Sequence, residues 1–197
     1  MTLPEKLKLE TSALHTQLET NTLLQKLTSD GISKGEYKII LEKFFGFFYP
    51  LEEKLTSFAA EITPFLPDFA ERRKSDWLLR DLSEISDPVK QQEIKFCNDL
   101  PEVNNSADAF GCLYVLEGST LGGRFISKSL NTSLNLTANT GASYFNGYAD
   151  KTGSKWKTFR EALQNFSEQN KSKNDLITFS ANNTFLKLNN WLSQTDE

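Results

Sequence analysis

The sequence is poor in the residues from which metal and disulfide sites are built. It has one histidine, His15, and two cysteines, Cys97 and Cys112, among 197 residues. Two cysteines cannot make a disulfide framework, and one histidine excludes HExxH zinc sites and any catalytic centre with two imidazoles. Any imidazole chemistry must therefore use His15. We expect both thiols to be core residues of a protein in a reducing cytoplasm.

Long apolar runs, a basic excess and nucleotide motifs are also missing. No run approaches the roughly 18 apolar residues that cross a bilayer, and the opening MTLPEKLKLE lacks the apolar core of a secretory signal. The net charge is -4 and the basic residues are scattered, which argues against nucleic-acid binding. Because neither GxGxxG nor GxxxxGK[ST] occurs, any electrons must come from another molecule. We expect a cytoplasmic protein that binds neither membranes nor nucleic acid.

Phenylalanine is abundant, with fifteen residues, and apolar positions recur at helical spacing nearly everywhere. There is no internal repeat and no strand alternation that would build a sheet. The pattern predicts an all-α fold of about seven or eight helices, packed as one compact domain over residues 1–197. Nothing in the sequence requires more than a monomer.

Capping patterns and helix breakers predict where the helices lie. The expected boundaries are a helix over about 3–20, one from the SKGE capping box at Ser33 to Ile62 with a bend at Gly46 and Pro50, a break over 63–67, a helix over 69–85, a helix start at Asp87 and Pro88, a glycine-interrupted helix from Ser106, mostly loop over 131–153, and helices near 154–169 and 173–194, the last opening with the capping pattern SKND.

The first predicted helix places Lys8, His15 and Glu19 on one face, at steps of seven and four. Glu19 is close enough to accept a hydrogen bond from one ring nitrogen of His15. That bond would fix the tautomer and leave the other nitrogen free as a metal ligand. Lys8 lies roughly 10 Å along the axis, comparable to the reach of a porphyrin from its iron to a propionate. The alternative is a histidine on a solvated face with an i,i+4 partner.

The stretch EGSTLGGRF carries Gly118, Gly122 and Gly123 inside an apolar helical pattern. Each glycine in a helix interior costs roughly 1 kcal/mol relative to alanine, so the three need a reason. One interpretation is a close helix crossing. The other is a flat ligand lying against bare backbone, over which the helix bends.

These two segments resemble a known family. LHTQLE, residues 14–19, is similar to the proximal-histidine helix of heme oxygenases, and YVLEGSTLGGRFI, residues 114–126, is similar to their glycine-rich distal helix in its bacterial form. The resemblance extends to FFGFFYPLEEKL, KWKTFRE and TFLKLNNWL, so it covers most of the chain in order. The family is all-helical, in agreement with the pattern.

The resemblance implies roles for individual residues. His15 would be the axial ligand of the heme iron. Gly118, Gly122 and Gly123 would line the distal face, where the backbone steers bound oxygen toward one meso carbon. The propionates would meet Lys8 and Lys157, with Arg160 as a substitute for a family arginine that aligns onto Glu161, and the macrocycle would pack near an aromatic, Phe185.

The sequence departs from mammalian members at Ser119, which stands where they carry an aspartate that orders the proton-delivering water. A hydroxyl can hold a water but brings no carboxylate. Backbone carbonyls freed by the bend, Ser119 itself or Glu117 are the candidates to support that network.

The resemblance implies an enzyme that degrades heme, as both substrate and cofactor, to biliverdin, carbon monoxide and ferrous iron with O2. The electrons would come from a ferredoxin, a flavodoxin or a flavoprotein reductase, and Lys155 and Lys157 would suit an acidic donor. One rival is a heme carrier or sensor of the same fold, suggested by the missing carboxylate. A second is a thiaminase-like helical enzyme with Cys112 as nucleophile, although its set of acidic residues is not identifiable.

Overall fold

The computed structural model describes residues 1–29, 31–85 and 94–194. In these ranges the chain forms eleven α-helices and several 3-10 turns, without a strand. The helices are α1 Leu3–Glu10, α2 Ser12–Glu19, α3 Thr22–Gln25, α4 Lys34–Thr56, α5 Ala59–Ile62, α6 Ser75–Ile85, α7 Ser106–Gly118, α8 Gly123–Leu134, α9 Ser143–Asn146, α10 Thr152–Gln169 and α11 Asn174–Leu192. The all-α prediction is confirmed. The helices outnumber the predicted seven or eight because several expected helices are divided.

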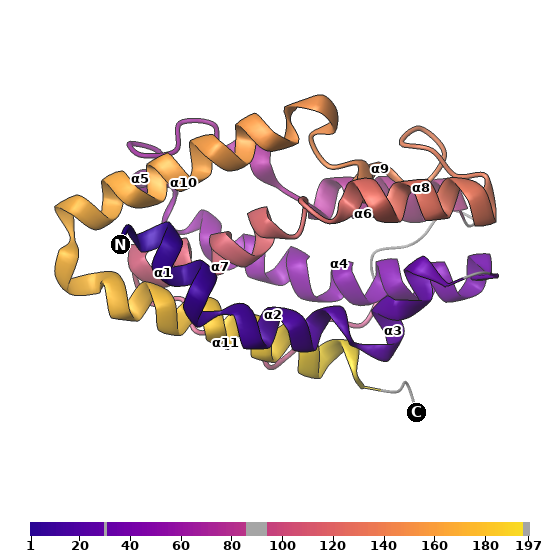
Figure 1. The fold of residues 1–197 in the computed structure, drawn as a ribbon, viewed down its shortest axis with the longest axis horizontal. Helices are drawn as coiled ribbons and strands as arrows, with labels where there is room; N and C mark the ends of the chain where they lie inside the picture. Colours follow the sequence, from indigo (N-terminus) through magenta and orange to yellow (C-terminus); the bar gives the residue numbers. More distant parts are fainter. Residues whose placement is uncertain (30, 86–93, 195–197) are drawn as a thin grey trace.

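Helix α7 lies at the centre of the molecule, between α10 and α11 (Figure 1). Every residue from Ser106 to Glu117 is buried, as expected for a helix that is apolar on all sides. Helix α4 runs along most of the length of the fold and adds four buried phenylalanines to the same core: Phe44, Phe45, Phe47 and Phe48. None of the helices in the described ranges is both long and apolar enough to cross a membrane.

Helix α4 begins as the sequence predicts. The Ser33 hydroxyl accepts a bond from the Glu36 amide at 3.2 Å, and the Glu36 carboxylate accepts one from the Ser33 amide at 3.0 Å. The helix continues through Gly46 and Pro50 but ends at Thr56, and α5 is a separate short helix. At Gly46 a Cβ would lie 2.3 Å from the Lys95 carbonyl oxygen, so this glycine permits close approach of another segment.

Two predicted helices are broken. The first divides at Thr11, whose hydroxyl donates to the Leu7 carbonyl at 2.8 Å. Such side-chain bonds compete with regular helix geometry. The predicted 69–85 helix is a 3-10 turn followed by α6, separated at Arg73, where ψ is 126°.

The prediction that residues 131–153 are mostly loop was wrong in part. Helix α8 continues to Leu134, α9 forms in the middle, and α10 starts at Thr152. The carboxylate of Asp81 on α6 accepts bonds from the backbone N–H groups of Ser143 at 2.7 Å and Tyr144 at 2.8 Å. These bonds satisfy free donors at the start of α9, and no local pattern signals them.

The ends of the last two helices lie close to their predicted positions, but the SKND capping pattern does not operate. Helix α11 begins at Asn174 without a side-chain cap, after a 3-10 turn over Lys171–Lys173. Asp87 and Pro88 lie outside the described residues, so the helix start expected there stays a prediction.

Candidate functional site

Helix α2, which carries His15, is attached at its two ends and has no buried residue between them. Thr11, before its start, is buried, and its side chain lies next to that of Tyr114 on α7. Asn21, after its end, donates to Asn189 at 3.0 Å and to Ser193 at 2.9 Å on the α11 side. Helix α2 is therefore held by contacts at its two ends, and most of its surface is exposed.

The geometry of His15 agrees with its sequence spacing. Its side chain is 54% exposed, and Nδ1 lies 3.5 Å from a carboxylate oxygen of Glu19. The ring also packs edge-on against Phe185 of α11, with centroids 5.7 Å apart. Nδ1 thus faces a carboxylate while Nε2 is the other ring nitrogen, an arrangement that suits a metal ligand.

The glycine segment is a break between two helices, where the sequence predicted one bent helix. Helix α7 ends at Gly118 and α8 begins at Gly123. The Ser119 hydroxyl donates to the Leu116 carbonyl at 2.7 Å and lies next to the side chain of Tyr144. Thr120 is buried, and its hydroxyl donates to the Glu117 carbonyl at 2.8 Å.

The three glycines have different surroundings. A Cβ on Gly122 would meet nothing within 4 Å, and one on Gly118 would meet only the Trp156 ring at 4.0 Å. A Cβ on Gly123 would lie 2.0 Å from the Phe145 carbonyl oxygen. Gly123 therefore permits the close packing of α8 on α9, while Gly118 and Gly122 border open space.

One contact relates His15 to the glycine segment. His15 lies four residues after Thr11 and Gly118 lies four residues after Tyr114, and the side chains of Thr11 and Tyr114 lie next to each other. Each group is therefore about 6 Å, one helical turn, beyond that contact. In Figure 1 the chain continues from α2 and from the α7 end toward the same side of the view, with α2 in the lower part and α8 in the upper part.

Two aromatic residues that the sequence analysis did not single out border this region. Tyr114 and Trp156 pack with ring centroids 5.6 Å apart, and Trp156 is the ring nearest to Gly118. Burial raises the pKa of the Tyr114 phenol, so it stays neutral. The i,i+4 spacing of Tyr114 and Gly118 was the sequence feature that could have placed Tyr114 near this region.

The predicted propionate partners differ from one another in their ion pairs. Lys8 and Arg160 are exposed, and neither makes an ion pair within the described ranges. Arg160 lies near enough to Tyr114 to influence its pKa, after the larger effect of burial. Lys157 lies 3.8 Å from Glu161. Lys155, which we expected to suit an electron donor, is instead paired with Asp68 at 2.5 Å.

The Glu117 carboxylate is bonded to protein groups through both oxygens, so it does not suit the predicted role of holding water. Its side chain is 1% exposed, and its two carboxylate oxygens accept bonds from Arg72 and Lys74, each at 2.5 Å. Tyr148 donates a further bond at 3.0 Å. This buried ion cluster was not foreseen, because its members lie far apart in the sequence.

Cys112 has the surroundings of a core thiol. It is buried on α7 and bonds Ser180 at 3.5 Å and Thr184 at 3.3 Å. Burial raises its pKa, which disfavours the thiolate that a nucleophile needs. Among the described residues no group of three or more His, Cys, Asp or Glu side chains could hold a metal ion.

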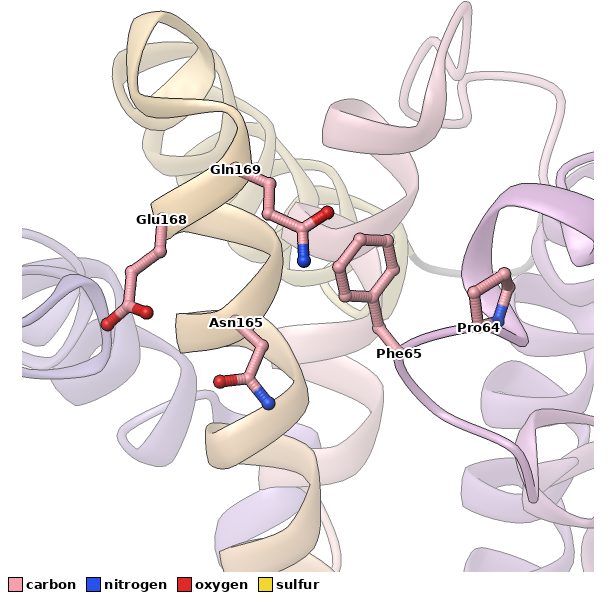
Figure 2. Close-up of a pocket in the computed structure, with 5 residues that line it drawn as sticks. All are labelled: Pro64, Phe65, Asn165, Glu168 and Gln169. Carbon is pink, nitrogen blue, oxygen red and sulfur yellow. The ribbon is translucent and has the colours of Figure 1, made fainter.

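A surface hollow lies elsewhere, between the chain after α5 and the end of α10. It is lined by Pro64, Phe65, Asn165, Glu168 and Gln169 (Figure 2). None of the predicted site residues lines it, and its polar side chains come from one helix. We assign it no role.

Comparisons with known proteins agree with the fold. A family model described as heme oxygenase matches residues 1–194. The heme oxygenase PigA of Pseudomonas aeruginosa is 27% identical over 192 residues, which are 97% of this chain and 91% of that protein. A heme oxygenase structure from Leptospira interrogans aligns with a TM-score of 0.82 at 20% identity, over 98% of this chain and 99% of the other. The NO- and CO-bound heme oxygenase of Neisseria meningitidis aligns with a TM-score of 0.81 at 24% identity, over 98% and 90%.

Proposed function

This chain belongs to the heme oxygenase family, and we propose that it binds heme between α2 and the break that separates α7 from α8. There it would oxidise the heme with O2 to biliverdin, carbon monoxide and ferrous iron. The relative from Pseudomonas aeruginosa, named as a heme oxygenase, supports this activity at 27% identity.

The residues at this place fit a flat macrocycle. Gly118 and Gly122 carry no side chain. A Cβ would enter open space at Gly122 and would meet only the Trp156 ring at Gly118. Helix α2 opposes them with no buried residue of its own and with a half-exposed imidazole. A heme has large apolar faces, so covering these surfaces would be favourable at about 25 cal/mol per Å2.

His15 would hold the iron through Nε2 while the Glu19 carboxylate accepts a hydrogen bond from Nδ1–H. This bond would fix the tautomer and the orientation of the ring. Neutral imidazole does not push for O–O cleavage as a thiolate does. Phe185, packed edge-on against His15, would fix the tilt of the ring. When bound, the heme supplies the redox chemistry and the carbon atom that is oxidised.

Lys8 and Arg160 would bind the heme propionates. Both are exposed cations without a carboxylate partner in the described part of the chain, so neither has to give up an existing ion pair. Lys157, close to Glu161, would contribute less.

Gly118, Ser119, Gly122 and Gly123 would form the side opposite His15. The first and third keep side chains away from the reacting atoms, and Gly123 holds α8 against α9. Proton delivery would use water held by exposed backbone groups and Ser119, because both oxygens of Glu117 are occupied by Arg72 and Lys74. The electron donor would be a ferredoxin, a flavodoxin or a flavoprotein reductase, and the protein would act in the cytoplasm as a monomer.

The observation that carries the proposal is that His15 and Gly118 each lie one helical turn beyond the contact between Thr11 and Tyr114. The test is to add hemin, then ascorbate or a reductase system under air. Loss of the Soret band with growth of a red biliverdin absorption is the expected result. A spectrum that stays that of free hemin when the protein is added would overturn the proposal.

A heme carrier or sensor is the second candidate. The observation that favours it is Ser119, whose hydroxyl is bonded to Leu116 and lies next to Tyr144, and which brings no carboxylate. The same experiment separates the two functions. A Soret band that persists under air with a reductant would indicate carriage.

A further inference from the structure

Glu117 immediately precedes Gly118 and is the most firmly bonded side chain next to the glycine segment. Its Oε2 accepts from Arg72 and its Oε1 from Lys74, both at 2.5 Å, and the Tyr148 hydroxyl donates at 3.0 Å. We call Arg72, Lys74, Glu117 and Tyr148 the Glu117 cluster.

The Glu117 cluster has no vacant donor at its centre. The Lys74 ammonium donates to the Arg72 carbonyl at 2.6 Å, to Glu117 and to Tyr148 at 2.9 Å. Burial lowers the pKa of Lys74, and Glu117 is the main group that opposes this change. Buried ion pairs add little net stability compared with apolar residues of similar size. Stability alone is therefore a poor explanation for this cluster.

We propose that the Glu117 cluster is a positioning device that fixes the glycine segment at the height above His15 that the ligand requires. This inference rests on the proposed function for its ligand, but its structural part does not. Glu117 acts through Gly118 and Gly122, and it touches no reacting atom.

The glycine segment needs such an anchor because its own side chains are missing. A Cβ would meet nothing within 4 Å at Gly122 and only the Trp156 ring at 4.0 Å at Gly118. The α8 side of the break is held by the close packing of Gly123 on Phe145, and the α7 side must be held by the residues before and between the first two glycines. Glu117 does so twice. Its side chain is fixed by the Glu117 cluster, and its carbonyl accepts from the Thr120 hydroxyl at 2.8 Å and from the Thr120 N–H at 3.2 Å.

The other side of the Glu117 cluster is itself anchored. Glu52 on α4 accepts from the Lys74 N–H at 2.5 Å and from the Ser75 N–H at 3.2 Å, which caps the start of α6. Buried bonds therefore run without interruption from α4 through Lys74 to Glu117. Such a path holds the end of α7 relative to the long core helix.

The experiment compares Glu117→Gln with Asp108→Asn, which makes the same kind of change at the opposite end of α7. Asp108 is also buried and accepts bonds from Asn104 and Asn105, each at 2.9 Å. Amide hydrogen exchange of the ligand-free proteins is measured first. We expect exchange over 118–121 to rise at least tenfold in Glu117→Gln and to stay unchanged in Asp108→Asn, which should affect only the start of α7.

The heme-loaded proteins give a second readout. In Glu117→Gln the C–O stretching band of the ferrous carbon monoxide complex should broaden or split, and the ratio of biliverdin isomers should change at least threefold. The Soret position of the ferric form should stay that of wild type, because His15 is untouched. Asp108→Asn should match wild type in all three.

Wild-type exchange over 118–121 in Glu117→Gln would overturn the inference, and so would an unchanged carbon monoxide band and isomer ratio. If Glu117→Gln does not fold, Glu117→Asp carries the test, with the same direction and smaller changes. If wild-type protein fails to bind hemin, the proposed function fails, and the exchange measurement still decides whether Glu117 positions the glycine segment.

Discussion

The ring of His15 stands edge-on to Phe185, with centroids 5.7 Å apart and planes at 80°. Phe185 is only 5% exposed and belongs to α11, which packs on the central helix. A half-exposed candidate ligand thus packs against a buried ring of the core. Substitutions at exposed candidate residues should therefore change heme binding, and substitutions at packed positions should change stability.

Replacing His15 by alanine should weaken hemin binding at least tenfold and shift the Soret band, with recovery on adding free imidazole. The midpoint of thermal unfolding should hardly change, because the side chain is 54% exposed. Absorption titration and thermal unfolding are the measurements. Gln17→Ala, at another exposed position of α2, is the control and should bind hemin as wild type does. Equal hemin spectra for His15→Ala and wild type would refute the assignment of the ligand.

Gly122→Ala and Gly123→Ala should have opposite effects. The first methyl enters open space, whereas the second would lie 2.0 Å from the Phe145 carbonyl oxygen. We expect Gly122→Ala to fold normally and to lose hemin affinity and turnover. Gly123→Ala should lose roughly 1–3 kcal/mol or more of unfolding free energy, since backbone must move. Denaturant unfolding and hemin titration of the two variants test this, and a strongly destabilised Gly122→Ala would contradict it.

Lys8→Ala and Arg160→Ala should each reduce hemin affinity about two- to fivefold, as expected for exposed ion pairs of about 0.5–1 kcal/mol. The effect should shrink at high salt. Lys155→Ala is the matched control. It breaks a pair with Asp68 at 2.5 Å, so it should affect thermal stability slightly and hemin affinity not at all. The reverse pattern would remove Lys8 and Arg160 from the site.

Acid stability should depend on Glu36. The bond from Lys26, followed by those from Ser33, lowers the pKa of Glu36 from 4.5 to about 2. Because the pKa is lower in the folded state, this contribution to stability is present above about pH 4.5 and is lost as the pH falls toward 2. Glu36→Gln should flatten the fall of the unfolding midpoint in that range. Glu61→Gln, at an exposed position whose side chain makes no hydrogen bond or ion pair in the described ranges, should leave the profile steep.

Cys112→Ala should retain hemin binding and turnover. The thiol is buried against Ser180 and Thr184, so its removal should cost on the order of 1–2 kcal/mol in unfolding free energy. Complete loss of turnover in a folded Cys112→Ala protein would revive a thiol-based mechanism.

Much of the fold follows from local sequence. The capping box at Ser33 starts α4 as predicted, because its two bonds join residues three apart. The spacing of His15 and Glu19 likewise determines their 3.5 Å approach. Helical periodicity was sufficient for the fold class.

Residues distant in the sequence decided the remainder. Helix α9 depends on Asp81, because the glycines on either side of it, Gly141 and Gly147, favour loops. Likewise, three neighbouring glycines look alike in the sequence, but only the position of Phe145 distinguishes Gly123 from Gly122.

The sequence by itself determined that the protein is helical, that His15 alone can supply an imidazole, and that three glycines lie close together later in the chain. These properties depend on residue type and on spacings of three or four, which a helix converts directly into neighbours. Tertiary structure alone decided that Glu117 belongs to a buried ion cluster and that the side chains of Thr11 and Tyr114 meet. Those contacts join residues about 30 to 100 positions apart, and no local periodicity encodes them.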